Sequence, residues 1–168
     1  MTPETRKLAL TAHITVSVGW LGAVLCFLVL SVAAFVSADV ERVRALYDAM
    51  ELAGWAVLLP LALASLVTGL IQSLGTHWGL LRHYWVVAKL SMNLFATVVL
   101  LLYMATFQDS TGTGPSTSVE ELRDPSPVVH AGAAFGLLLT AVFLSVYKPR
   151  GVTRYGRRRR RAALETTS

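Results

Sequence analysis

The sequence predicts an all-α polytopic membrane protein, a four-helix bundle with both termini cytoplasmic. Hydrophobic residues make up 54% of the 168 residues and charged residues only 15%, whereas soluble domains usually carry about 25% charged residues. Four stretches of 19 to 31 residues contain no Asp, Glu, Lys or Arg, namely 8–38, 52–81, 90–108 and 125–147. Because a helix needs about 20 apolar residues to cross the hydrocarbon core, each stretch is long enough for one span.

The distribution of basic residues predicts the orientation of these spans. If both termini are cytoplasmic, twelve of the fifteen Lys and Arg residues lie on or near the inner side, and only Arg42, Arg44 and Arg123 lie outside. This asymmetry is typical of cytoplasmic loops, so the net charge of +5 reflects topology. The basic run at 157–161 has no interleaved aromatic residues, which favours contact with anionic lipids and argues against nucleic acid.

The first span is predicted over about 8–36. Arg6 and Lys7 precede it, as in a signal peptide, but its apolar run is about twice the usual core of roughly 7–15 residues, so we expect a retained helix. One face is formed by residues at helical spacing, namely His13, Ser17, Trp20 and Val24. A second face carries Gly19 and Ala23, a small-residue pair that permits close helix packing.

The second span is predicted over about 52–73, after a charged segment at 39–51. That segment has apolar residues at helical intervals, so it forms either a short outer-surface helix with Asp39 as N-cap or a plain extension of the span. Within the span, a mostly small or polar stripe is expected to face the bundle: Gly54, Leu58, Leu61, Ser65, Gly69 and Gln72. Pro60 is expected to kink the helix, since it leaves the carbonyl of Ala56 without its usual donor.

The remaining spans are predicted over about 85–107 and 128–147. The outer loop between them is rich in Ser, Thr, Gly and Pro and lacks apolar periodicity. The fourth span places Gly132, Gly136 and Thr140 on one face, suited to close helix contact within the bundle or between copies of the chain. The chain thus divides into a transmembrane domain at 1–148 and a basic cytoplasmic tail at 149–168.

Lys89 is the first candidate for chemistry within a span. Ionisable groups inside a membrane are costly unless they are paired, hydrated or near the interface, which makes them functional candidates. Lys89 forms a stripe with Trp85 and Asn93, four residues before and after it. Two interpretations stay open: the stripe faces the bundle interior, or the Lys89 ammonium extends to the inner lipid headgroups.

Histidines form the second group of candidates. A pair of neutral imidazoles on different helices would hold a haem between them if they shared a membrane depth. His13 meets that condition with His83 or His77, whereas His130 is near the outer end of the fourth span, roughly 12 Å away in depth. Each histidine has an alternative role as a hydrogen-bonded interfacial residue.

Several classes of site are excluded or disfavoured. Cys26 is the only cysteine, so an intrachain disulfide or a thiolate zinc site cannot form. The four uncharged stretches contain no carboxylate, which argues against a proton-coupled transporter that needs a buried acid and against a di-metal carboxylate site. Gly-rich phosphate loops and Ser-His-Asp arrangements are absent. These absences favour a protein that is not an enzyme.

Residues 13–22 (HITVSVGWLG) resemble the H-x6-W start of the first helix in a broad group of small bacterial membrane proteins. The group includes the copper-resistance D type and the haem-containing, four-helix type of protoporphyrinogen oxidase. Residues 85–90 (WVVAKL) are similar to the W-x3-K-L that opens a later helix in that group. More closely, residues 8–107 resemble an uncharacterised family of actinobacterial four-span membrane proteins, through AHITVSVGWLGAV, SLVTGLIQSLGTHWGL and RHYWVVAKL.

The resemblance implies that His13 is a candidate haem or metal ligand and that Lys89 is its polar companion. His83 is a further cofactor-binding candidate because of its predicted depth in the membrane, which matches that of His13. The oxidase type has a basic residue and often a second histidine near the far end of its first helix. Residues 25–38 contain neither, which disfavours porphyrin oxidation more than haem binding.

The sequence therefore leaves three functional classes as alternatives. The first is an accessory or structural protein of the bacterial inner membrane, acting alone, as a homo-oligomer or with a membrane protein partner. The second is a b-type haem redox protein, and the third a copper or small-solute transporter.

Overall fold

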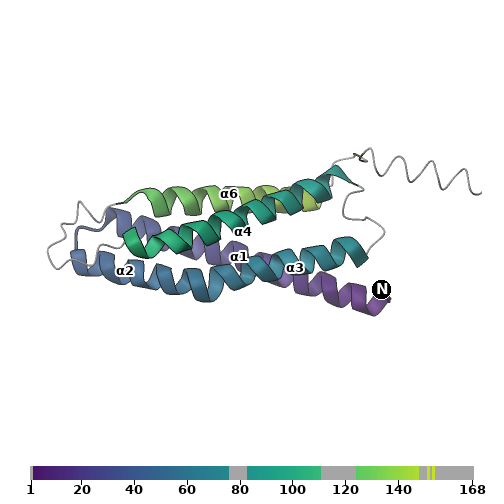
Figure 1. Cartoon of the computed structure of the whole chain (residues 1–168), viewed down its shortest axis with the longest axis horizontal. Helices are drawn as coiled ribbons and strands as arrows, with labels where there is room; N and C mark the ends of the chain where they lie inside the picture. The colour runs from purple at the N-terminus through teal and green to yellow at the C-terminus, as the bar shows by residue number, and fades with distance from the viewer. Residues whose placement is uncertain (1, 76–82, 111–123, 148–150, 152, 154–168) are drawn as a thin grey trace, which may run out of the picture.

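The computed structural model describes residues 2–75, 83–110, 124–147, 151 and 153. Its helices form an elongated bundle (Figure 1): α1 (Pro3–Val36), α2 (Val40–Ala53), the π-helical turn η1 (Gly54–Leu58), α3 (Leu59–Gly75), α4 (Tyr84–Ser110) and α6 (Ser126–Tyr147). The predicted all-α four-helix bundle is confirmed. The predictions for His77, for most of the outer loop and for nearly all of the basic tail fall outside the described residues.

Four helical segments of the described chain are long and apolar enough to cross a membrane: Pro3–Val36, Val40–Gly75, Tyr84–Phe107 and Ser126–Tyr147. These are the lengths and compositions of a multi-pass membrane protein. The segments contain the four predicted spans, and each begins earlier than predicted: by five residues in the first, twelve in the second, one in the third and two in the fourth. The first extension has a local cause, since the Thr2 side chain accepts a hydrogen bond from the Thr5 amide and Pro3 opens the helix.

The charged segment before the second span continues directly into it. Asp39 caps α2 as predicted, with its carboxylate accepting from the Glu41 amide at 3.0 Å. The helix then runs without a break through η1 into α3, which fits the extension alternative. The wide turn at η1 lies just before Pro60, where the missing amide would interrupt an α-helical ladder.

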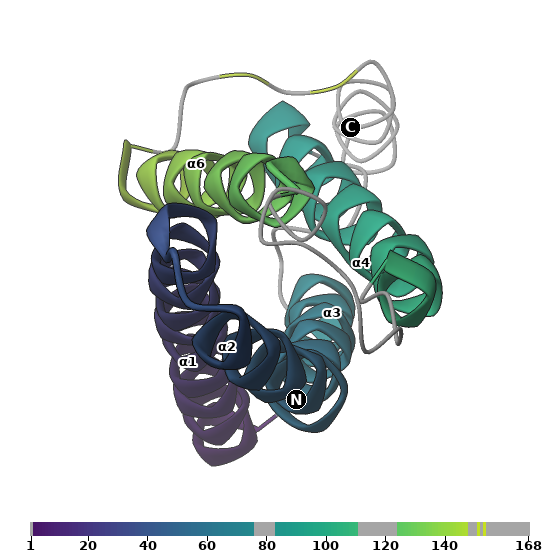
Figure 2. The ribbon, with the colours of Figure 1, turned by 90° about the vertical axis from the view of Figure 1, so that its left-hand side faces the viewer.

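The four long helices form a closed ring of neighbours. Helix α1 packs beside α3 and α6, and α4 packs beside the same two helices, so α1 and α4 occupy opposite corners (Figure 2). The start of α1 and the ends of α3 and α6 share one end of the bundle (Figure 1). This end corresponds to the predicted cytoplasmic side and is called the inner end below.

The best-packed core lies in the half of the bundle nearer the outer end. Helix α1 contributes a buried face of residues spaced at three or four positions: Trp20, Val24, Phe27, Ser31 and Ala34. Val43, Tyr47 and Met50 of α2 are also buried, so this charged helix still has an apolar inward face. Phe107 joins the two groups, because its ring lies against Phe27, Tyr47 and Tyr103.

Large apolar side chains cover the outside of the spans. Those exposed by more than half of their surface include Val18, Val29, Phe95, Leu102 and Phe143. A soluble monomer rarely exposes a continuous apolar surface of this size. In a bilayer the same side chains face lipid tails, which need no polar covering.

Substitutions at two glycines, Gly54 and Gly132, test how closely the helices pack. A methyl group at Gly54 would fall 2.5 Å from Sδ of Met104, which is itself 1% exposed, whereas one at Gly132 would meet nothing within 4 Å. We expect Gly54→Ala to lower the free energy of unfolding by about 1–3 kcal/mol through overpacking. Gly132→Ala is expected to be neutral or slightly stabilising. Unfolding of both variants by SDS titration from mild detergent is the measurement, and equal stabilities would contradict this packing.

Candidate functional site

Polar side chains from all four spans meet in the half of the bundle nearer the inner end. They are joined by hydrogen bonds between helices, and we call them the polar seam: His13, Ser17, Ser65, Thr68, Lys89, Asn93 and Ser145. The seam contains both predicted site residues that lie inside spans. Ser65 was predicted to face the bundle, and its contact with Ser17 on α1 confirms it.

His13 is held by a hydroxyl group on the neighbouring helix. Its Nδ1 lies 3.0 Å from Oγ1 of Thr68 on α3. The Thr68 hydroxyl donates its only proton to backbone carbonyls of its own helix, at 2.7 Å from Ala64 and 3.2 Å from Ser65. When the Thr68 proton is on these carbonyls, the neutral His13 ring donates from Nδ1 to Thr68 and has its lone pair on Nε2.

A glycine makes room for the His13 ring. A methyl group at Gly69 would lie 3.2 Å from Cε1 of His13, closer than most methyl contacts. The imidazole therefore packs directly on the backbone of α3, one residue beyond the threonine that binds it. This contact accounts for the predicted inward stripe of the second span at Gly69.

Ser65 connects three helices. Its Oγ is 3.0 Å from Oγ of Ser17 on α1 and accepts a hydrogen bond from Nδ2 of Asn93 on α4 at 3.1 Å. Ser65 is 2% exposed. The backbone carbonyl of Asn93 in turn accepts from the buried Thr97 hydroxyl at 2.8 Å. Helices α1 and α4, which occupy opposite corners of the ring, are thereby linked through α3.

Lys89 points to the fourth span. Its ammonium donates a hydrogen bond to Oγ of Ser145 on α6, and the Ser145 hydroxyl donates to the Ala141 carbonyl at 3.0 Å. With Asn93 bonded to α3, the stripe of the third span faces the bundle, which is the first of the two predicted alternatives.

The Lys89 contact predicts a difference between two hydroxyl deletions on α6. Ser145→Ala should lower the free energy of unfolding by about 0.6–1.7 kcal/mol, the range measured for hydrogen bonds between membrane helices. Thr140→Ala is the control, because its exposed hydroxyl bonds only to the Gly136 carbonyl of its own helix at 2.8 Å. SDS titration of both variants gives the comparison, and equal losses would indicate that Lys89 extends to the headgroups instead.

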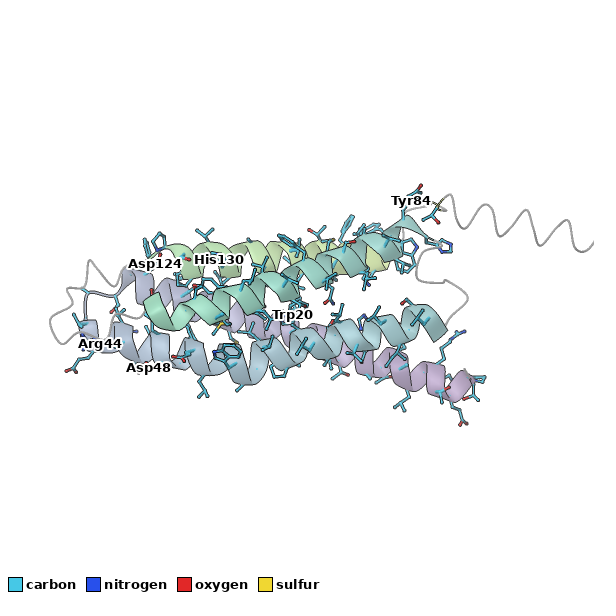
Figure 3. All side chains as sticks on the ribbon, viewed as in Figure 1. Trp20, Arg44, Asp48, Tyr84, Asp124 and His130 are labelled. Atoms are coloured by element: carbon cyan, nitrogen blue, oxygen red, sulfur yellow. The ribbon has the colours of Figure 1, made fainter. Side chains whose placement is uncertain are left out.

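His83 occupies the beginning of α4 and is half-buried. Its backbone carbonyl accepts from the amides of Val86 and Val87 at 3.2 and 3.3 Å, so its main chain helps to start the helix. Figure 3 places the adjacent Tyr84 at the inner end. The structure thus places His13 on α1 and Lys89 on α4, at opposite corners of the ring, and His83 at the beginning of α4.

Metal coordination by clustered side chains has no support in the described part of the chain. No group of three or more His, Cys, Asp or Glu residues there is arranged to hold a metal ion. His130, expected at a different depth, lies at the start of α6 near Asp124 (Figure 3). Its Nδ1 donates to the Ser126 carbonyl at 2.9 Å, and its ring stacks on Tyr103.

An apolar cavity lies between the helices on the outer side of the polar seam. It measures about 50 Å³ and is lined by Trp20, Val24, Phe27, Leu58, Ala96, Leu100, Tyr103, His130, Ala131 and Ala134. Trp20 is 2% exposed, and its Nε1 has no hydrogen-bond partner. An unpaired buried donor costs about 1–3 kcal/mol. Helical spacing placed Trp20 on one face with His13 and Val24, but this cavity has no signal in the sequence, because its lining comes from four separate segments.

Comparisons of the chain with protein-family models, with curated proteins and with solved structures found no match.

Proposed function

We propose that this multi-pass membrane protein is an accessory or structural component of the bacterial inner membrane. The observation that supports this proposal is that the polar groups inside its spans bond to hydroxyl groups on neighbouring helices. His13 bonds to Thr68, Asn93 to Ser65 and Lys89 to Ser145. Side chains that resembled a cofactor site are thus engaged in holding the bundle together.

The energetics of membrane helices support this role. Helices already dissolved in lipid gain little from apolar burial, so packing and interhelical hydrogen bonds supply their attraction. The seam joins α1 to α3, α3 to α4 and α4 to α6. It therefore ties together the end of the bundle where apolar burial is sparse.

The proposed partners follow from the apolar exterior of the spans and from the positive charge of the tail. The lipid bilayer surrounds the apolar exterior, and the basic tail at 149–168 contacts anionic lipids of the inner leaflet. A second copy of the chain or another membrane protein would bind along an exposed span. The proposed kinship is with the actinobacterial four-span family named above, for which the resemblance supplies no activity.

A b-type haem protein is the second candidate, and one observation favours it. The hydrogen bond to Thr68 holds the His13 ring in place, and in the tautomer that donates from Nδ1 the Nε2 lone pair is available, the arrangement in which histidines bind metals. The donor chemistry of His13 therefore fits an axial haem ligand. His83 or Lys89 would be the companion group on α4.

A visible absorption spectrum separates the two candidates. The protein is expressed with adequate haem supply, purified in mild detergent, and measured oxidised and dithionite-reduced beside His13→Ala. The accessory role predicts no Soret band, together with a lower free energy of unfolding for His13→Ala. A near-stoichiometric Soret band that His13→Ala abolishes would overturn the accessory role and establish a haem protein.

A further inference from the structure

We propose that the inner half of the bundle holds a water-filled vestibule, which opens at the inner end and is closed halfway across the membrane. This proposal goes beyond the accessory role and does not depend on it. It rests on three features of the described residues: where side chains become buried, which helices the seam bonds connect, and where polar groups lie in the membrane.

Burial stops at one level along the four long helices. None of the described residues at 3–19, 66–75, 83–95 and 139–147 is buried, and these ranges lie in the inner halves of α1, α3, α4 and α6. The first buried residues met from the inner end are Trp20, Ser65, Ala96 and Leu138. A molecule the size of water therefore reaches side chains throughout the inner half, and its access ends at this level.

The seam bonds nearest the inner end stay within two pairs of helices. His13 of α1 bonds to α3, and Lys89 of α4 bonds to α6. The bond that joins the two pairs, from Asn93 to Ser65, lies one turn of α4 beyond Lys89. At the inner end α1 and α3 lie on one side of the bundle, and α4 and α6 on the other (Figure 1). The seam thus fastens the two pairs at the level of Ser65, which is also the level where burial begins.

The groups that face this inner half favour water over lipid tails. Lys89 donates to a neutral hydroxyl, and the four uncharged stretches hold no carboxylate that could balance its charge. Asn93, which is half-buried, lies nine residues beyond Tyr84, about 14 Å along the helix and near the middle of a core about 30 Å thick. Ionisable and polar groups at such depth are stable where they line water. Lipid tails beside them would leave part of their hydrogen-bonding capacity unsatisfied.

Apolar packing closes the vestibule on its outer side. Beyond Trp20, the rings of Phe27 and Phe107 are 5% and 2% exposed, and their centroids lie 6.3 Å apart. Water needs polar partners to occupy a space, and these rings offer none. Water therefore reaches His13 and Lys89 from one side of the membrane, which the predicted orientation makes the cytoplasmic side.

Modification of single cysteines tests the vestibule. The reagent is 2-sulfonatoethyl methanethiosulfonate, which reacts with thiolates in water and does not cross membranes. Cys26→Ala supplies the background, since Cys26 is exposed. Ser17→Cys and Thr68→Cys place a thiol at the vestibule. Val18→Cys and Val67→Cys are the matched controls, because these neighbouring side chains are 62% and 53% exposed on the outside of the bundle.

We expect Ser17→Cys and Thr68→Cys to react about tenfold faster than the two controls, because a thiol surrounded by lipid stays protonated. The reaction should proceed from one side of the membrane only, and the predicted orientation makes this the side exposed in inverted vesicles. Ser31→Cys, at a position of the outer half of α1 that is 2% exposed, should be protected from both sides.

The proposal is overturned if the thiols at 17 and 68 react no faster than those at 18 and 67, which would place lipid tails between the helix pairs. It is also overturned if they react from both sides, or if Ser31→Cys reacts as fast as Ser17→Cys. Positions 17 and 68 lie on different helices, so either variant decides if the other does not fold. If neither folds, the unaltered protein decides by NMR: magnetisation should pass from water to the Thr68 methyl group and not to those of Val67.

Discussion

Replacing Ser65 by Ala is expected to lower the free energy of unfolding by about 2–3 kcal/mol, although only one oxygen atom is removed. Ser65 bonds to two other helices, at 3.0 Å to Ser17 and 3.1 Å to Asn93. The substitution breaks both bonds and leaves the Asn93 amide without this acceptor inside the bundle. An unpaired amide in a nonaqueous interior costs more than the bond itself contributes.

Ser73→Ala is the matched control for Ser65→Ala. It lies on the same helix, and its hydroxyl donates to the Leu70 carbonyl of that helix at 2.9 Å. We expect a loss below about 0.5 kcal/mol for this control, because local hydroxyl bonds in helices contribute little. SDS titration from mild detergent measures both variants. If the two lose the same stability, Ser65 does not join the helices in the way described.

Phe107→Ala is expected to have the largest effect, a loss of about 3 kcal/mol. Phe107 is 2% exposed, and its ring lies 5.6 Å from those of Tyr47 and Tyr103 and 6.3 Å from that of Phe27. Its removal opens a cavity where α1, α2 and α4 meet. The value is near the lower limit for buried phenylalanines, because side chains released into detergent or lipid avoid transfer to water.

Phe143→Ala provides the control for Phe107→Ala. Phe143 is 57% exposed and stacks only on the neighbouring Tyr147 of its own helix, at 4.1 Å. Its loss should change the free energy of unfolding by less than about 1 kcal/mol. The same titration compares the two variants, and a larger effect for Phe143→Ala would mean that the cluster around Phe107 is not the main packing centre.

The spans were predictable because they depend on hydrophobicity and charge along the chain, which can be read directly from the sequence. A membrane excludes charge, so stretches without charged residues define the helices without knowledge of their neighbours. Helical spacing also placed His13, Ser17, Trp20 and Val24 on one face of the first span, but did not show that this face points into the bundle. Asp39 was recognisable as a cap, since a carboxylate at that position bonds locally to the Glu41 amide.

Features that depend on contacts between helices could not be predicted in the same way. Lys89 had two equivalent interpretations, because the sequence does not show that Ser145, 56 residues later, lies beside it. The role of Thr68 was hidden for the same reason. The wide turn at η1 was expected only as a kink at Pro60, and the cavity beside Trp20 gave no sequence signal because it results from four segments packing imperfectly.

A double-mutant cycle between His13 and Thr68 tests the central claim most directly. The claim is that His13 holds α1 to α3 through its hydrogen bond to Thr68. Free energies of unfolding are measured for His13→Leu, Thr68→Val and the double variant, all freed of haem. The account predicts a coupling energy of about 0.6–1.7 kcal/mol. A coupling energy of zero, with full stability in His13→Leu, would contradict it and leave the imidazole free for another role.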